Sequence, residues 1–174
     1  MEAEVKAEAQ DKCIKLLIKP DWSEIAASRI ETRKFLEKNL FQKNHIARLE
    51  MVASELMENA IKYGYYPEKN ESIEYSVEIG NTGVILEVKH KIIPDDMNLQ
   101  IFDSRIQWIR SFQDPFQAYV ERLKYVSEKS FADAESGLGL ARIAYEGHSI
   151  IDFYLSENNI LAVSAVYRVN NPME

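Results

Sequence analysis

The segment from Ser54 to Gly64, Ser-Glu-Leu-Met-Glu-Asn-Ala-Ile-Lys-Tyr-Gly, most constrains what this chain can fold into. It ends a stretch whose apolar residues recur at helical spacing, namely Ile46, Leu49, Ala53, Leu56 and Ala60. That period predicts an amphipathic helix that begins near Asn44 and ends at Gly64. The fold must therefore provide a core on which this face can be buried.

A polar stripe runs along another side of the same predicted helix. At ~100° per residue, Glu55, Asn59 and Lys62 fall within roughly 60° of one another, away from the apolar face. An amide such as Asn59 suits magnesium, a carboxylate such as Glu55 can accept a proton, and Lys62 can approach phosphate oxygens. Solvated helix faces also carry these residue types at these spacings, so the stripe alone more often has only a structural role.

The remaining segments predict the rest of the fold. Five of them have the pattern of strands: 12–19, 72–79, 84–93, 149–155 and 160–169. Helical patterns occupy residues 21–40, 44–63, 95–134 and 137–146. Helices gathered against consecutive hairpins predict an α+β fold, a two-layer sandwich whose mixed but mostly antiparallel sheet has helices on one face.

Length and charge limit the classes of protein. A chain of 174 residues suits a single domain, 1–174, in which residues 1–11 form a loose N-terminus. The net charge of −7 argues against binding to nucleic acid or an anionic membrane, although an acidic surface still tolerates a local cationic pocket. Cys13 is the single cysteine, so an internal disulfide is excluded.

The sequence favours a cytoplasmic protein. Its N-terminus is charged and lacks the apolar run of a signal peptide, and no stretch approaches ~18 uninterrupted apolar residues. The oligomeric state is left open, a homodimer included.

A second motif is Ser136-Gly137-Leu138-Gly139-Leu140, which stands at a loop-to-helix junction. Glycines at such a junction let backbone N–H groups approach an anion, and the helix dipole favours the negative charge. Ser136, Gly137, Leu138 and Gly139 are therefore candidate phosphate-binding residues. The alternative is a turn with close packing of the helix on the sheet at Gly139.

Together the two motifs resemble a known ATP-binding fold. Ser54-Glu55, Asn59-Ala60 and Tyr63-Gly64 resemble the N box of anti-sigma-factor kinases, with Tyr63 where that family commonly has histidine. Gly137 to Leu140 resembles their second glycine box. Both boxes belong to the GHKL, or Bergerat, fold shared by gyrase, Hsp90 and sensor histidine kinases. The resemblance implies ATP and Mg²⁺ as cofactors, Asn59 as the magnesium ligand and Glu55 as the base.

The adenine-binding box of that family, Asp-x-Gly-x-Gly, is missing. No glycine occurs between Val84 and Glu135, and Ile92 and Ile93 would fill the space that those glycines keep open for adenine. His90, Asp95 or Asp96 could replace the aspartate, but each fits a strand end or a helix cap better. Glu135 replaces the first glycine of the second box and is electrostatically unhelpful beside phosphates.

These departures resemble a subgroup, the short bacterial regulators of the SiaB type, over about residues 45–168. Its members carry a helical insert before a Gly-Leu-Gly-Leu segment, as residues 95–134 do here in place of the ATP lid. They include kinases that phosphorylate Ser or Thr of small STAS-type antagonist proteins. They act by partner switching, in which phosphorylation decides which protein is bound.

Two functions follow from the resemblance. The first is a partner-switching serine/threonine protein kinase that uses ATP and Mg²⁺ on a STAS-domain protein. The second is a non-catalytic protein-binding module of the same fold, which the lost adenine box and the aromatic residues of the insert favour. Those aromatic residues, expected in the core more often than at an interface, are Trp108, Phe112, Phe116 and Tyr119. A sensor histidine kinase is disfavoured, because the chain has no long dimerisation hairpin that presents a phosphorylatable histidine. A hydrolase is disfavoured because no hydrolase motif stands out.

Overall fold

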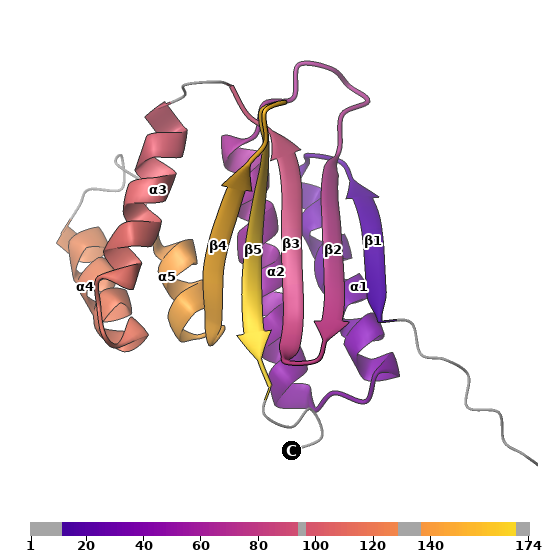
Figure 1. Cartoon of the computed structure of the whole chain (residues 1–174), viewed down its shortest axis with the longest axis horizontal. Helices are drawn as coiled ribbons and strands as arrows, with labels where there is room; N and C mark the ends of the chain where they lie inside the picture. Colours follow the sequence, from indigo (N-terminus) through magenta and orange to yellow (C-terminus); the bar gives the residue numbers. More distant parts are fainter. Residues whose placement is uncertain (1–11, 94–96, 129–136, 170–174) are drawn as a thin grey trace, which may run out of the picture.

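The computed structural model describes residues 12–93, 97–128 and 137–169, which form one sheet with helices over one face and beyond one edge (Figure 1). The predicted loose N-terminus, residues 1–11, lies outside the described residues. Within the described ranges, no helix is long and apolar enough to cross a membrane.

The sheet has five strands in the order β1-β2-β3-β5-β4. Their bounds are β1 Cys13–Ile18, β2 Ile73–Gly80, β3 Gly83–Lys91, β4 Ser149–Leu155 and β5 Ile160–Arg168. Each of the four described pairings is antiparallel. The predicted α+β, two-layer fold with a mostly antiparallel sheet is thus confirmed, and no parallel pair occurs among the described strands.

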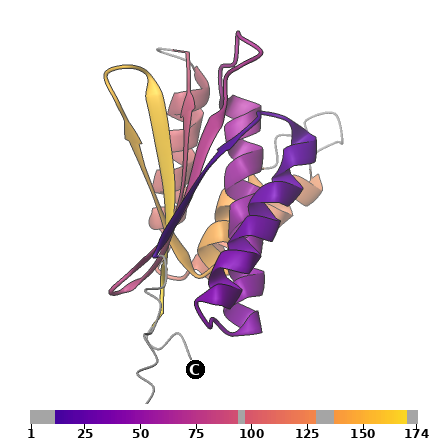
Figure 2. The same cartoon turned by 90° about the vertical axis from the view of Figure 1, so that its right-hand side faces the viewer.

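The helices divide into two groups. Their bounds are η1 Trp22–Glu24, α1 Ile25–Lys38, α2 Lys43–Tyr63, α3 Met97–Arg110, α4 Pro115–Glu128 and α5 Leu138–Tyr145. Helices α1 and α2 cover one face of the sheet, which is seen edge-on in Figure 2. Helices α3 and α4 lie beyond the β4 edge, and α5 contacts β4, α2 and α4 (Figure 1).

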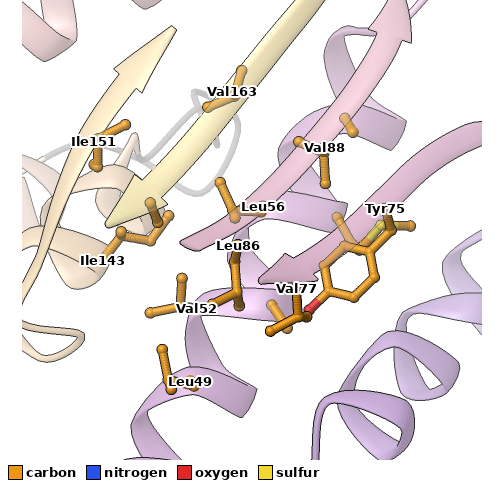
Figure 3. Packing of buried hydrophobic residues seen from close by; sticks show 14 of the residues in the cluster. Leu49, Val52, Leu56, Tyr75, Val77, Leu86, Val88, Ile143, Ile151 and Val163 are labelled. Carbon is orange, nitrogen blue, oxygen red and sulfur yellow. The ribbon is translucent and has the colours of Figure 1, made fainter. Parts of the chain in front are cut away.

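Alternation along the strands builds the sheet's side of the core. Tyr75 of β2, Val88 of β3 and Val163 of β5 are cross-strand neighbours, and all three are buried (Figure 3). Two residues further along the strands, Val77 and Leu86 repeat the arrangement. Because side chains alternate along a strand, this register places every second residue against the helices.

Helix α2 supplies most of the facing layer. The five residues predicted to form its apolar face are all buried, as are Val52 and Met57. The helix begins at Lys43, one residue before the predicted Asn44, whose side chain accepts from the N–H of His45 at 2.8 Å. It ends where predicted, because Gly64 is extended and the Tyr66 hydroxyl donates to the Ala60 carbonyl at 2.8 Å.

Polar contacts fix the neighbours of the sheet. The buried hydroxyls of Thr32 in α1 and Tyr75 in β2 lie 2.5 Å apart. At the other edge, Arg110 Nη2 of α3 donates to the Ile151 carbonyl of β4 at 2.7 Å and pairs with Asp152 at 3.1 Å. Each contact joins a helix to a strand, so both groups of helices are held in register with the sheet.

The helical insert is present as predicted in its described part. Asp114 accepts from the N–H of Phe116 at 2.9 Å, and Pro115 is the first residue of α4, as its sequence suggested. The predicted core placement is wrong for Trp108 and Phe116, which are 37% and 46% exposed. Trp108 packs edge-on against the ring of Phe112. The ring of Phe116 lies against Tyr145. Trp108 and Phe116 therefore each contact another aromatic ring while remaining partly exposed.

Truncation of Leu49 tests the central place of α2. Leu49 is fully buried, so Leu49→Ala is expected to lower the free energy of unfolding in urea by about 2–5 kcal/mol, through lost burial and a residual cavity. The matched control is Ile30→Ala on α1, whose side chain is 49% exposed, with an expected change within about 0.5 kcal/mol. Equal losses in the two variants would contradict this assignment of the core.

Candidate functional site

Glu55 lies between α2 and α5, where it is only 8% exposed. Arg142 of α5 reaches back to it, and its Nη1 donates to Glu55 Oε1. The same guanidinium also contacts Glu146, one turn further along α5, at 3.3 Å. The sequence placed Glu55 on a stripe outside the core; the structure buries it because α5 covers that flank of α2.

Burial changes the acid–base character of Glu55. Removal from water raises the pKa of the Glu55 carboxyl, and the nearby Arg142 partly opposes that rise. The carboxylate is held by an ion pair between two helices, and Arg142 occupies one of its oxygens.

Gly139 makes the close approach of α5 to α2 feasible. A Cβ atom on Gly139 would overlap the Glu55 carboxylate oxygen, and it would stand 3.9 Å from Asn59 Nδ2. Gly139 therefore allows close packing, as predicted, but the neighbour it packs against is α2 and not the sheet. The fold also brings together Glu55, Asn59 and Gly139, residues of two motifs far apart in the sequence.

Asn59 presents an unusual amide. Its Nδ2 is buried and has no hydrogen-bond partner in the part of the chain that the structure describes. A buried donor without a partner costs about 1–3 kcal/mol, so such a group marks a place where a water, an ion or a ligand can bind. Asn59 forms part of the wall of a cavity between α2, β3, β5 and α3.

That cavity occupies the place where the resemblance puts adenine, and it is almost filled. Its volume is about 20 Å³, which is room for about one water molecule. Pockets for small organic ligands start at about 300 Å³. Apolar side chains of α2, β3, β5 and α3 line it, Leu99 and Phe102 of α3 among them, together with Ile92 after β3.

The residues suggested in place of the adenine aspartate behave differently from one another. His90 is buried at the end of β3, its Nδ1 donates to the Lys91 carbonyl at 3.1 Å, and burial lowers the pKa of its imidazole. Ile92 fills the cavity wall as predicted, whereas Ile93 is 47% exposed. Asp95 and Asp96 lie outside the described residues.

The other predicted residues are spread around this corner. Lys62 is exposed, and its ammonium lies 5.1 Å from the centre of the Tyr63 ring. Gly137 caps α5 with a φ of 55°, in the left-handed region that favours glycine, and Leu138 begins the helix. Ser136 and Glu135 lie outside the described residues.

Sequence reasoning missed three arginines that the structure places at these motifs. Arg142 reaches Glu55, while Arg105 of α3 and Arg122 of α4 both approach Gly137. A signal existed for Arg142 alone, since it stands one turn before Glu146 and two residues after the glycine motif. The pairing of Arg105 with Arg122 depends on how two insert helices pack, which residue spacing does not reveal.

The fit to ATP and magnesium is therefore partial. The glycines and the Asn59 amide suit the phosphate and metal end, but the adenine end is closed and Glu55 is engaged. Across residues 12–93, 97–128 and 137–169, no group of three or more His, Cys, Asp or Glu side chains could hold a metal ion.

A chain of the crystal structure of the SiaB–SiaC complex from Pseudomonas aeruginosa is similar to this protein. The TM-score is 0.68 at 18% sequence identity, and the match covers 88% of each chain. The two share a fold. No protein-family model and no curated protein matches the sequence. The predicted likeness to the SiaB type is supported at the level of the fold.

Removal of Arg142 tests whether Glu55 depends on its ion pair. Arg142→Met leaves a buried carboxylate without its partner and is expected to cost about 3 kcal/mol near neutral pH, the low end for a buried pair because Arg142 is partly exposed. Glu146→Gln, which removes the other partner of Arg142, is the control and should cost less. Urea unfolding of the three proteins measures the difference.

The same variant has an expected pH dependence. A raised pKa means that folded protein binds the Glu55 proton more tightly than unfolded protein does, so this group's contribution to stability falls as pH rises above about 4.5. Without Arg142 the rise in pKa is larger. The loss in Arg142→Met should therefore be smallest near pH 4.5 and grow toward pH 7; a constant loss would contradict it.

Substitution of Gly139 tests the close approach of the two helices. Gly139→Ala places a methyl group on the Glu55 carboxylate and is expected to destabilise the protein by about 1–3 kcal/mol. Gly80→Ala is the control, because a Cβ there meets only the Gly83 carbonyl oxygen at 3.8 Å. Thermal unfolding that ranks the two variants in the opposite order would rule out this role.

Proposed function

We propose that this chain is a non-catalytic regulator of the partner-switching type. It acts in the cytoplasm by binding a protein partner, for which the resemblance suggests a STAS-domain protein. In this proposal the corner between α2 and α5 descends from an ATP site and now serves the structure of the protein.

The closed cavity carries this proposal. Adenine would have to displace Ile92, Leu99 and Phe102, of which Ile92 and Phe102 are almost fully buried. Displacing buried apolar side chains forfeits about 1.5–3 kcal/mol for each. This cost reduces the free energy of binding of any nucleotide that enters the cavity, so ATP at millimolar concentration is expected to bind poorly.

The state of Glu55 supports the same conclusion. A kinase base must face the hydroxyl whose proton it accepts, within hydrogen-bond reach. Here Arg142 occupies the carboxylate, and α5 covers it at Gly139. Freeing Glu55 would require α5 to move and would leave Arg142 without its deepest partner.

The fold supports a role in protein binding. The similar chain comes from a structure in which SiaB and SiaC form a complex. The match covers 88% of the present chain and 88% of the matched chain. Exposed aromatic side chains on the insert, such as Trp108 and Phe116, offer contact area of the type that protein interfaces use.

A second candidate is an ATP-dependent serine/threonine kinase, and one observation favours it. Asn59 keeps a buried amide without a described partner, and it lies beside the glycine motif that would hold phosphates. If no ligand binds at this corner, the unpaired amide donor destabilises the folded protein and no interaction compensates that cost. In a kinase, α3 would have to move aside to admit the nucleotide.

Titration with ATP and Mg²⁺ separates the two candidates. By calorimetry, wild-type protein and Asn59→Ala are both expected to show no binding up to millimolar ATP, because the adenine place is filled. Asn59→Ala should be slightly more stable or unchanged, since it removes an unpaired buried amide. Wild-type binding that disappears in Asn59→Ala would refute the loss of ATP binding and favour the kinase, which transfer of the γ-phosphate to a partner protein would then test.

Partner binding is the positive half of the test. Purified STAS-domain proteins from the same genome are titrated against this chain with and without ATP. One of them is expected to bind with an affinity that ATP leaves unchanged. Binding that requires both ATP and Asn59 would contradict the non-catalytic role.

A further inference from the structure

Strand β1 forms an open edge of the sheet. It pairs with β2 on one side, and the described elements end at β1 on the other side (Figure 1). Figure 2 looks onto this edge, with β1 in front of the sheet. The opposite edge differs, because α3 lies beyond β4 and Arg110 of α3 donates to the Ile151 carbonyl. The β1 edge therefore has room for a further strand, and the β4 edge is covered.

The backbone of β1 presents unpaired hydrogen-bonding groups at this edge. The Ile79 N–H donates to the Lys12 carbonyl at 2.7 Å, so in the antiparallel register these two residues form a hydrogen-bonded pair. Because such pairs alternate along a strand, Cys13, Lys15 and Leu17 direct their N–H and C=O groups away from β2. Within residues 12–93, 97–128 and 137–169, none of these groups has a hydrogen-bond partner. An added strand would complete the ladder.

Lysines line the same edge. Lys12, Lys15 and Lys19 are all exposed, and none of them forms an ion pair with another residue of the described ranges. On the neighbouring strand, Glu74 is already paired with Lys89 at 3.3 Å. The chain as a whole carries a net charge of −7, so the β1 edge is a basic strip on an acidic protein.

The lysines distinguish between possible occupants of the edge. A second copy of the chain would bring its own three lysines to the same place, and like charges on adjacent strands are destabilising. Lysines on an edge strand are a common protection against self-pairing. An acidic strand is attracted by the same charges, and its backbone can satisfy the outward groups of β1.

We propose that the β1 edge is a docking site for an extended acidic segment of a partner protein, which adds to the sheet as a sixth strand. An acidic residue of the segment lies opposite Lys15. An uncharged residue lies opposite Cys13, because Glu78 of β2 is the neighbour of Cys13. An apolar residue lies opposite Leu17, whose side chain is 76% exposed and lines a hollow of about 380 Å³.

This site deepens the proposed function: it rests on the existence of a protein partner and names the contact that the partner makes. It uses neither Asn59 nor α5, so it is independent of ATP. Strand addition obtains affinity from main-chain hydrogen bonds and specificity from alternate side chains, which is why charge at Lys15 should decide the sequence that binds.

Amide hydrogen exchange, followed residue by residue by NMR, provides the measurement. In the free protein the N–H groups of Cys13, Lys15 and Leu17 should exchange quickly, whereas those of Ile14 and Leu16, which face β2, should exchange slowly. The probe is a capped peptide, Glu-Val-Thr-Val-Glu-Val-Thr-Val-Glu. At saturation it is expected to slow exchange of the three outward amides by about tenfold or more, and to bind more weakly as salt is added.

Two further peptides separate strand addition from simple charge attraction. One has lysine in place of each glutamate, and it should not bind because it meets the lysines of the edge. The other keeps the glutamates and has proline in place of each valine and threonine, so it lacks most of the N–H groups that a ladder requires. It should leave the exchange of Cys13, Lys15 and Leu17 unchanged.

Variants of β1 identify the site. Lys15→Glu should weaken binding of the glutamate peptide by about tenfold and allow the lysine peptide to bind, because it reverses the charge at the centre of the edge. Leu17→Pro removes an N–H that faces away from β2, a place where an edge strand tolerates proline, and should weaken binding by about threefold to tenfold. Circular dichroism checks that both variants are folded.

The matched control is Lys34→Gln. Lys34 lies on α1 and pairs with Glu31, so its loss changes the net charge as Lys15→Gln would but leaves the β1 edge intact. Binding of the glutamate peptide should stay within about twofold of the parent, as expected for an exposed ion pair.

Equal binding of the glutamate peptide to the parent and to Lys15→Glu, or equal protection by the proline form, would overturn the proposal. Protection that appears without peptide and grows with protein concentration would assign the edge to a second copy and would also overturn it. A STAS-domain protein that binds the parent and Lys15→Glu equally well would contradict this site and leave the proposed function standing. Peptide protection at β1 without binding of any STAS-domain protein would support the site and count against that choice of partner.

Discussion

The ion pair between Glu55 and Arg142 is the contact on which the arrangement of this protein depends. Helix α2 is covered on two flanks and carries a buried glutamate on each: Glu50 pairs with Arg33 of α1, and Glu55 pairs with Arg142 of α5. A buried carboxylate is costly unless a cation or hydrogen-bond donors compensate its charge, and here an arginine does so at each position. Since Gly139 leaves room for the Glu55 carboxylate, α5 can pack closely against α2. Helix α5 also contacts β4, so its position is tied to that edge of the sheet.

This constraint gives a residue of the first motif a structural contact. Glu55, which the resemblance suggests as a base, accepts from Arg142 of the helix that covers it. The cavity beside it is closed by Ile92 and by Phe102 of the insert.

Local patterns predicted much of this fold and little of the site's surroundings. The alternation in β2 and the apolar period of α2 were sufficient, because each reflects burial against one neighbour. The burial of Glu55 was not predictable in the same way, since the polar stripe of one helix says nothing about a second helix that covers it. Trp108 was assigned to the core from its size, but its helix lies at the sheet edge with a free side. The approach of Arg105 and Arg122 to Gly137 arises from packing between segments and has no local signal.

The strand order has a consequence for how the chain reaches this structure. The two hairpins, β2–β3 and β4–β5, can each form from neighbouring residues, but β3 pairs with β5 only after the insert and α5 have been placed between them. Joining the hairpins is the long-range step, and such steps slow folding more than they weaken the folded state. Loop-closure entropy grows only logarithmically with length. The exposed connections of the insert between these hairpins can therefore be lengthened at small entropic cost while the sheet and the buried face of the insert stay the same.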